Sequence, residues 1–230
     1  MKYFLLSTQD SASRSLFEKL RSRKNEEWKW LTQKDDIDLN IDDLPFAHAQ
    51  KAFVFRWPHL LDENVLALTE FIGFHTSNLP EGRGGSPLQN QIMDDIYESR
   101  INALKLVKEA DAGPVYTYRD VSLHGSIDDV WRTLSTLAYE MIQVIIDSNL
   151  TPQPQDPGVY KTYKRRRNNS LSLMSNDSIE SVFRFIQMLD GEGYPQAFLD
   201  MGDFKIEFSR ASMRSGTITC DARITTRTTQ

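Results

Sequence analysis

Residues 74–87 read FHTSNLPEGRGGSP, and this stretch decides the fold that the sequence predicts. A histidine, His75, directly follows the apolar run 71–74, and the positions after it are rich in Pro, Gly and Ser. Such a composition makes the backbone turn tightly and leaves it open to a ligand. Because open α/β sheets present reactive groups at the carboxyl ends of their strands, the stretch predicts a buried strand that leads into a ligand-binding loop.

Apolar runs on both sides of this stretch predict the other strands of one sheet, and amphipathic segments predict the helices that cover it. The predicted strands are residues 2–7, 28–31, 52–55, 71–74, 103–107 and 115–118. The predicted helices are residues 10–23, 88–93 and 126–148. No glycine-rich phosphate loop follows the first strand, which argues against dinucleotide binding. The fold class is therefore α/β, a mostly parallel Rossmann-like sheet with helices on both faces.

The last third of the chain has a different character. Residues 151–158 contain three prolines and a glycine, which predicts a linker over the surface. One helix and two strands of a small α+β appendage are predicted after it, at residues 177–189, 204–208 and 217–224. We therefore expect a catalytic α/β domain at residues 1–150, followed by a linker and a small C-terminal element at residues 151–230.

The composition is that of a globular chain with one substantial core. No apolar run approaches the roughly 20 residues that span a bilayer, and no signal peptide is visible, so a cytoplasmic location without membrane contact is expected. The single cysteine, Cys220, excludes an internal disulfide and any multi-cysteine metal site, and no metal is expected. The net charge of -5 counts against a broad nucleic-acid surface, because phosphate binding depends on Lys and Arg.

Two separated motifs resemble the signature of the folate-dependent formyltransferases. The first half of that signature stands here as His75, Ser77, Leu79, Pro80, Arg83, Gly84 and Pro87. The second half, Asp-x-Gly-Pro, stands as residues 111–114, in the right order and at about the family's spacing. With the segments 193–198 and 208–211, the pattern is most similar to sugar N-formyltransferases of pseudaminic-acid-type, or nonulosonic acid, biosynthesis. The resemblance covers roughly residues 50–224.

This resemblance implies an enzyme that moves a formyl group from 10-formyltetrahydrofolate to an amino group. The implied acceptor is the 4-amino group of a nucleotide-linked deoxyamino sugar, in a pathway of polysaccharide biosynthesis. The implied partner is that sugar nucleotide, with no nucleic acid and with a homodimer as one option. Two alternatives stay open: a formyltransferase that acts on methionyl-tRNA or a ribonucleotide amine, and a catalytically silent folate- or nucleotide-binding protein.

Formyl transfer between two nitrogens needs a group that both accepts and returns a proton, and a histidine with a pKa of about 6.5 can do both. The resemblance implies His75 in this role, Asp111 as the carboxylate that orients it, and Asn78 as a further catalytic residue. In an alternative interpretation, Asp111 is a turn residue that bonds the backbone of residues 112–113. The family's usual asparagine, two positions before the histidine, is replaced here by Gly73, so either another donor stabilises the oxyanion or the activity is weak or lost. The candidate donors are Asn78, Ser77, a backbone N–H of residues 84–85 and a protonated His75.

The resemblance also implies which residues bind the two substrates. The folate pocket is expected to comprise Trp57, Leu60, Val107, Glu109 and Asp111. The acceptor site is expected to comprise Ser77, Arg83, Gly84, Gly85, Ser86, Lys164 and Arg165. Other interpretations are a core role for Trp57, a loop or core role for His59, and a solvated charge run for the basic cluster 164–167. The arginines of that cluster would otherwise suit phosphate oxygens.

Overall fold

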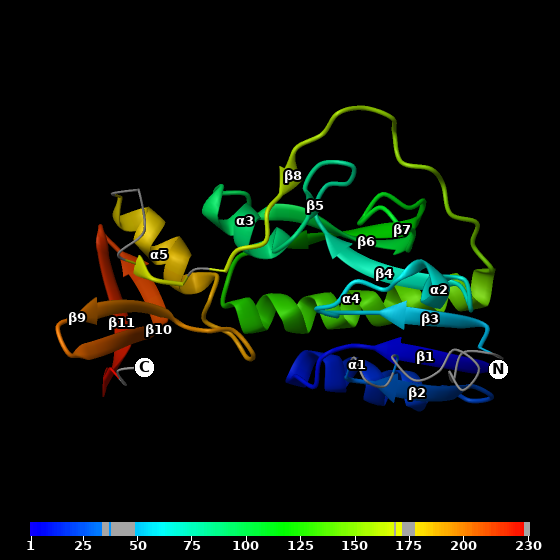
Figure 1. Ribbon diagram of the computed structural model, residues 1–230, viewed down its shortest axis with the longest axis horizontal. Helices are drawn as coiled ribbons and strands as arrows, with labels where there is room; N and C mark the ends of the chain where they lie inside the picture. The colour runs from blue at the N-terminus through cyan, green and yellow to red at the C-terminus, as the bar shows by residue number, and fades with distance from the viewer. Residues whose placement is uncertain (34–36, 38–48, 168, 172–177, 228–230) are drawn as a thin grey trace.

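A six-stranded sheet runs through the larger part of the molecule in the order β2-β1-β3-β4-β6-β7 (Figure 1). The structure is a computed structural model that describes residues 1–33, 37, 49–167, 169–171 and 178–227. The strands of this sheet are β1 (Lys2–Leu6), β2 (Glu27–Leu31), β3 (Lys51–Val54), β4 (Phe71–Thr76), β6 (Glu98–Lys105) and β7 (Val115–Ser122).

The sheet is mixed but mostly parallel. Strand β1 pairs in parallel with β2 and β3, and β3 pairs in parallel with β4. Strand β6 pairs antiparallel with both β4 and β7. The predicted α/β class is confirmed. Strand β6 begins at Glu98, earlier than predicted. The prediction relied on apolar runs, and the first residues of β6 include the polar Ser99, Arg100 and Asn102.

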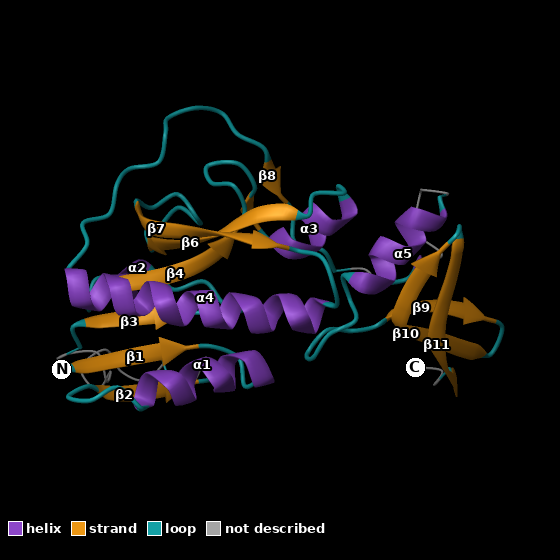
Figure 2. Ribbon diagram, turned by 180° about the vertical axis from the view of Figure 1, so that it is seen from behind, coloured by secondary structure: helices purple, strands orange, loops and turns teal. Residues whose placement is uncertain are grey.

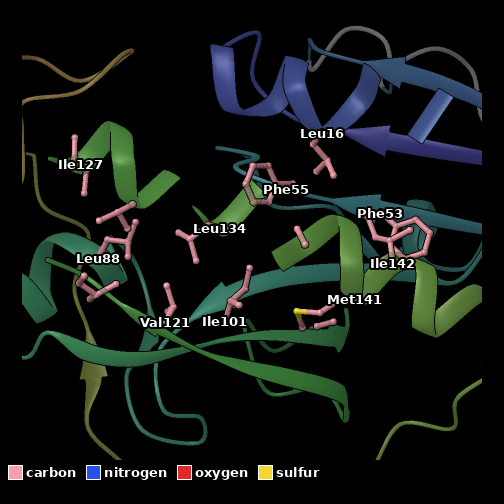
Figure 3. Packing of buried hydrophobic residues seen from close by; sticks show 14 of the residues in the cluster. Leu16, Phe53, Phe55, Leu88, Ile101, Val121, Ile127, Leu134, Met141 and Ile142 are labelled. Atoms are coloured by element: carbon pink, nitrogen blue, oxygen red, sulfur yellow. The ribbon is translucent and has the colours of Figure 1, made fainter. Parts of the chain in front are cut away.

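Alternate residues of the strands pack into two apolar clusters on opposite faces of the sheet. The larger cluster joins Phe53 and Ile101 of the sheet to α1 (Ser11–Arg21) and α4 (Ile127–Ser148) (Figure 3). Helix α4 lies along this face, in roughly the same direction as the neighbouring strands (Figure 2). The smaller cluster includes the short helix α2 (Glu63–Leu66) on the other face.

Both long helices begin at the residues that the sequence predicts. The side chain of Asp10 accepts the backbone N–H of Ser13 at 3.0 Å at the start of α1. The hydroxyl of Ser126 accepts the backbone N–H of Asp129 at 3.2 Å at the start of α4. Each cap satisfies a donor that the first helical turn leaves free, and it involves only residues three apart, so a sequence pattern can locate it.

The predicted linker is an extended strap that arches over the sheet and returns to the signature loop (Figure 1). At its far end β8 (Thr162–Tyr163) pairs in parallel with β5 (Arg83–Gly84). Helix α3 (Pro87–Met93) follows directly after β5. The strap therefore joins the basic cluster 164–167 to the loop that contains the first motif.

A three-stranded antiparallel sheet and α5 (Ile179–Gln187) form the appendage. Its strands are β9 (Ala197–Met201), β10 (Phe204–Arg214) and β11 (Thr217–Thr226). Strand β9 escapes prediction because it is short and only its first residue is buried. The hydroxyl of Ser178 caps α5, whereas Asp177 lies outside the described residues. The boundary at residue 150 stays a prediction. Among the described helices, none combines the length and the apolar character needed to cross a bilayer.

Candidate active site

His75 belongs to strand β4 and is buried, with 6% of its surface exposed. The prediction that the strand ends at residue 74 and the histidine opens the loop is corrected here. Strand β4 continues because β6 pairs with it as far as Thr76, with Asn102 opposite His75. The Asn102 amide donates to the carbonyl oxygens of His75, at 3.2 Å, and Ser77, at 2.7 Å. Asn102 thus holds the backbone at the end of the strand.

Both ring nitrogens of His75 face an oxygen. Nε2 lies 2.9 Å from the carbonyl oxygen of Gly82, and Nδ1 lies 3.3 Å from Oδ1 of Asp111. A backbone carbonyl only accepts hydrogen bonds, so Nε2 carries a hydrogen in this arrangement. Nδ1, beside the carboxylate, is therefore the nitrogen at which a proton can be exchanged.

Asp111 sits in a tight turn after β6, with a φ of 57°. Its second oxygen, Oδ2, accepts the backbone N–H of Gly84 at 3.0 Å. Burial alone raises the pKa of Asp111, but the hydrogen bond and charge of His75, the Gly84 N–H and the charge of Arg83 together lower it below its usual value. The carboxylate is therefore ionised at neutral pH. Asp111 is part of the turn, but its side chain contacts His75 and Gly84 rather than only the turn itself.

Gln155, on the strap, braces this turn. Its Nε2 donates to the carbonyl oxygens of Asp111 and Gly113, both at 2.8 Å. Its Oε1 accepts from Arg83 at 2.7 and 3.1 Å. Sequence reasoning missed Gln155, because a glutamine in a proline-rich linker has no pattern that points to a site 44 residues earlier.

Two glycines allow the close backbone contacts of the site. A Cβ on Gly113 would lie 1.8 Å from the carbonyl oxygen of Lys105, and one on Gly84 would lie 2.3 Å from that of Tyr163. Gly84 also has a φ of 104°, which L side chains rarely adopt. The two motifs therefore require glycine at these positions for packing as well as for any ligand.

A cavity of about 530 Å³ opens beside His75 and Asp111, both of which line it. Its apolar lining includes Trp57, Leu61, Leu66, Leu106 and Val107. Its remaining lining includes Gly84, Gly85, Ser86, Gln89, Trp131, Tyr194 and Arg165. A cavity of this volume, largely apolar with a few polar groups, is typical of small-molecule sites.

The structure brings most of the predicted folate residues to this cavity, but not all. Trp57, Leu60, Val107 and Asp111 line it, although Leu60 is 87% exposed. The Nε1 atom of Trp57 is buried and has no hydrogen-bond partner among the described residues. Because buried N–H groups are normally paired, this indole is suited to a ligand acceptor. Glu109 does not line the cavity, because its exposed side chain points to Arg83, 3.8 Å away.

The predicted acceptor residues divide in the same way. Gly84, Gly85, Ser86 and Arg165 line the cavity. Four other predicted residues, one of them catalytic, are not among its lining residues: Ser77, Asn78, Arg83 and Lys164. The burial and hydrogen bonds of these four residues account for their positions.

Ser77 is fully buried under the loop, and Asn78 is exposed, with its carbonyl oxygen accepting the N–H of Glu81. The Arg83 guanidinium bonds Gln155, and Lys164 is exposed, with its carbonyl oxygen bonded by Asn90. The Arg83 side chain therefore braces the loop and those of Asn78 and Lys164 face solvent, whereas the buried Ser77 hydroxyl has no hydrogen-bond partner among the described residues.

Gly73 lines the cavity and brings no side chain to it. A Cβ there would lie 2.6 Å from the Leu106 Cδ2 atom, the end of a flexible side chain. Strand β4 therefore offers no side-chain donor at this position, and a donor for the oxyanion must come from another residue of the cavity.

Three aromatic or basic residues of the cavity were also missed by sequence reasoning. The Arg56 guanidinium lies 4.2 Å from the ring centre of Trp131 and forms a 3.0 Å ion pair with Asp10. The Trp131 indole N–H donates to the Tyr194 hydroxyl at 3.0 Å. The turn at 193–195 was noted in the sequence, but nothing there indicated that Tyr194 would meet helix α4. Within the described residues, no group of three or more His, Cys, Asp or Glu side chains could hold a metal ion.

Comparison with known proteins defines the class of this fold and site. The profile of the family "Methionyl-tRNA formyltransferase, C-terminal domain" matches residues 168–225. The solved structure of methionyl-tRNA formyltransferase from Clostridium thermocellum is 28% identical in sequence to this chain. The two superimpose with a TM-score of 0.90 over 99% of this chain and 100% of the Clostridium chain. The chain therefore has the fold of the formyltransferases and is similar to them in sequence over its C-terminal part.

Curated proteins that are similar to this chain in sequence include several methionyl-tRNA formyltransferases. The curated methionyl-tRNA formyltransferase of Campylobacter curvus is 27% identical over 153 residues, which are 65% of this chain and 50% of that protein. The chain spans about half the length of the curated relatives that it matches. The solved structure of HypX from Aquifex aeolicus in complex with tetrahydrofolic acid is 17% identical in sequence. It aligns over 94% of this chain and 40% of the HypX chain with a TM-score of 0.69, and this similarity shows the fold alone.

These comparisons correct one expectation. The predicted formyltransferase-type fold is confirmed, and the sequence resemblance to the formyltransferases is supported. The predicted sugar nucleotide acceptor of a pseudaminic-acid pathway, with no nucleic-acid partner, is wrong, because the relatives in sequence are methionyl-tRNA formyltransferases. The two motifs do not by themselves distinguish the acceptor.

Proposed function

We propose that this protein transfers the formyl group of 10-formyltetrahydrofolate to the α-amino group of methionyl-tRNA. The observation that supports this most is the near-complete superposition on the Clostridium thermocellum methionyl-tRNA formyltransferase, at a TM-score of 0.90 over 99% of this chain. The match of residues 168–225 to the C-terminal domain of that enzyme adds support from the appendage.

The distribution of charge agrees with a nucleic-acid partner, although the net charge of the chain is -5. Residues 1–150 contain 16 basic and 23 acidic residues, whereas residues 151–230 contain 11 basic and 9 acidic ones. The negative charge thus belongs to the first part, and the second part is net positive. Binding to phosphates depends on the local density of Lys and Arg, so the charge of the whole chain is a poor guide to it.

In this proposal the basic cluster 164–167 contacts the acceptor stem of the tRNA. All four side chains are exposed, and Arg165 also lines the cavity. Strand β8, next to the cluster, is tied to the signature loop through β5. In this proposal Lys164 and the three arginines contact phosphates outside the cavity while the methionyl group enters it.

The apolar part of the cavity would hold the folate. Trp57, Leu106 and Val107 offer flat apolar surface to a ring system, and the unpaired indole N–H of Trp57 offers a donor. Leu60, at the exposed rim, would cover the bound ring. Residues 1–150 and 151–230 would thus divide the work, with the formyl-transfer site in the first and much of the tRNA contact in the second.

The His75–Asp111 pair would supply the proton transfers. The amine nitrogen attacks the formyl carbon, a new C–N bond forms, and the carbonyl oxygen takes the negative charge. The proton lost by the amine passes to Nδ1 of His75, where the Asp111 carboxylate stabilises the charged ring. When the bond from carbon to N10 of the folate breaks, the pair returns the proton to N10, and tetrahydrofolate leaves.

An assay with several acceptors tests this function. The protein is incubated with 10-formyltetrahydrofolate and, in parallel, with methionyl-tRNA, glycinamide ribonucleotide and a UDP-linked 4-amino sugar, and the mass of each acceptor is measured. We expect N-formylation of methionyl-tRNA alone, and its loss in His75→Ala. Formylation of another acceptor, or of none while folate still binds, would refute the proposal.

A further inference from the structure

Gln89, in the first turn of helix α3, has a buried side chain with no visible partner. It is 6% exposed and lines the cavity beside His75. Its Nε2 atom is buried, and no described residue accepts a hydrogen bond from it. A buried amide that lacks a partner is disfavoured, and it persists in folded proteins chiefly where a ligand or water completes the bond.

Gln91, two residues further along the same helix, shows what a structural glutamine looks like here. It is 2% exposed, and its Nε2 donates to the carbonyl oxygens of Thr76, at 2.8 Å, and Pro87, at 3.1 Å. Its Oε1 accepts the Ser99 hydroxyl at 2.6 Å. Both the nitrogen and the oxygen of the Gln91 amide are hydrogen-bonded, so the unpaired Nε2 of Gln89 is not a general property of this helix.

The hydrogen bonds of Gln91 also determine the position of Gln89 relative to His75. Thr76, the residue after His75, is the last residue of β4, and Gln91 ties helix α3 to it. The first turn of α3 is therefore held at the end of the strand that contains His75, and both His75 and Gln89 face the same cavity. Gly73, two residues before His75, brings no side-chain donor to that cavity.

We propose that the Gln89 side-chain amide donates a hydrogen bond to the formyl oxygen and stabilises the negative charge that it gains during transfer. This proposal rests on the proposed formyl-transfer function. A neutral amide donates at every pH at which the His75–Asp111 pair works, and it does not compete for the proton. The amide orientation in which Nε2 meets the ligand is reached by turning the end of the side chain.

Gln89→Leu and the nearly isosteric Gln89→Met test this assignment by kinetics. We expect kcat for methionyl-tRNA formylation to fall about 10²–10³-fold in both variants, because one oxyanion donor is lost. Since tetrahydrofolate lacks the formyl oxygen, its Kd should stay within about twofold of wild type. A kcat near the wild-type value in either folded variant would overturn the proposal.

A binding experiment separates this proposal from the proposed function. Isothermal titration compares tetrahydrofolate with a stable 10-formyl folate analogue, which differs by the formyl group. Wild type should prefer the formylated ligand, and Gln89→Leu should lose that preference even if methionyl-tRNA proves not to be the acceptor. Equal loss of affinity for both ligands would overturn the proposal, because Gln89 would then contact another part of the folate.

Thermal unfolding supplies a matched control in Gln91→Leu. Because Gln91 is fully hydrogen-bonded, its replacement should lower Tm clearly. Gln89→Leu should leave Tm equal or raise it, because the replacement removes an unpaired buried amide. A large loss of stability in Gln89→Leu would show that the amide has a structural partner and would overturn the proposal.

Discussion

Nδ1 of His75 lies 3.3 Å from Oδ1 of Asp111, and the other oxygen of the same carboxylate is held by the backbone N–H of Gly84. The contact joins β4 to the turn after β6, and so unites the two separated motifs of the sequence. Because Nε2 of the histidine is occupied by the Gly82 carbonyl, the carboxylate faces the nitrogen that can exchange a proton.

Replacing this histidine should abolish turnover but not folate binding. In His75→Ala we expect kcat to fall about 10²–10⁴-fold, the usual contribution of general acid–base catalysis. Formylation of methionyl-tRNA and titration with tetrahydrofolate measure the two effects separately. His124→Ala is the control, because this exposed histidine stacks on Tyr97 and does not line the cavity. Normal turnover in His75→Ala would remove the residue from the mechanism.

The Asp111 carboxylate should also make stability depend on pH. Its pKa is lowered in the folded protein, so the stabilisation is complete above the unfolded pKa of about 3.9 and is lost as the pH falls through the folded value. The difference in Tm between wild type and Asp111→Asn should therefore be constant from about pH 5 to 7 and shrink below about pH 4.

Turnover of Asp111→Asn should fall with the loss of the charge that stabilises the imidazolium. Asp120→Asn is the matched control, because this exposed carboxylate pairs with Arg100 on the sheet edge. A Tm difference for Asp111→Asn that grew toward low pH would contradict the direction of the shift.

Gln155 should act as a positioning residue. Gln155→Ala removes the two bonds that hold the Asp111 turn, so we expect kcat to fall about tenfold while KM for methionyl-tRNA stays unchanged. Stability should fall by about 1–2 kcal/mol, because a neutral hydrogen-bond network is lost. The neighbouring Gln153→Ala, whose side chain is exposed, should change neither value. Equal effects of both substitutions would point to a general loosening of the strap.

The basic cluster should govern affinity for the nucleic acid. Arg165→Ala and Arg167→Ala should each raise KM for methionyl-tRNA and reduce the slope of log K against log salt by about 0.7–0.9 for each phosphate that the variant no longer binds. Folate affinity should stay unchanged. Arg21→Ala, an exposed arginine on α1 that pairs with Glu18, is the control. Unchanged salt slopes in the cluster variants would assign the tRNA contact to another surface.

Much of this fold can be predicted from local patterns. The strands at residues 2–7 and 52–55 are apolar runs, and Asp10 and Ser126 cap helices through bonds to residues three positions away. Such features depend on near neighbours in the chain, which a single sequence displays. Strand β9 and the first half of β6 were missed, because half-exposed or polar strands do not form a continuous apolar run in the sequence.

The contact between His75 and Asp111 can be anticipated from the sequence, because both residues stand in motifs that resemble those of the formyltransferases. The acceptor cannot be predicted in this way. The net charge of the whole chain does not show that residues 151–230 are net positive, and the motifs resemble those of enzymes with different acceptors. Gln155 and Tyr194 reach the site from the linker and the appendage, and their positions follow from sheet order and packing.

The sequence by itself therefore determined the α/β class, the boundaries of the capped helices and the residues of the two motifs. Only the tertiary structure decided that Nδ1 of His75 faces Asp111, that Gln155 braces the turn, and that Gln89 keeps a free amide at the cavity. The reason is physical. Backbone conformation follows from residues a few positions apart, whereas a hydrogen bond between distant side chains depends on how whole strands and helices pack together.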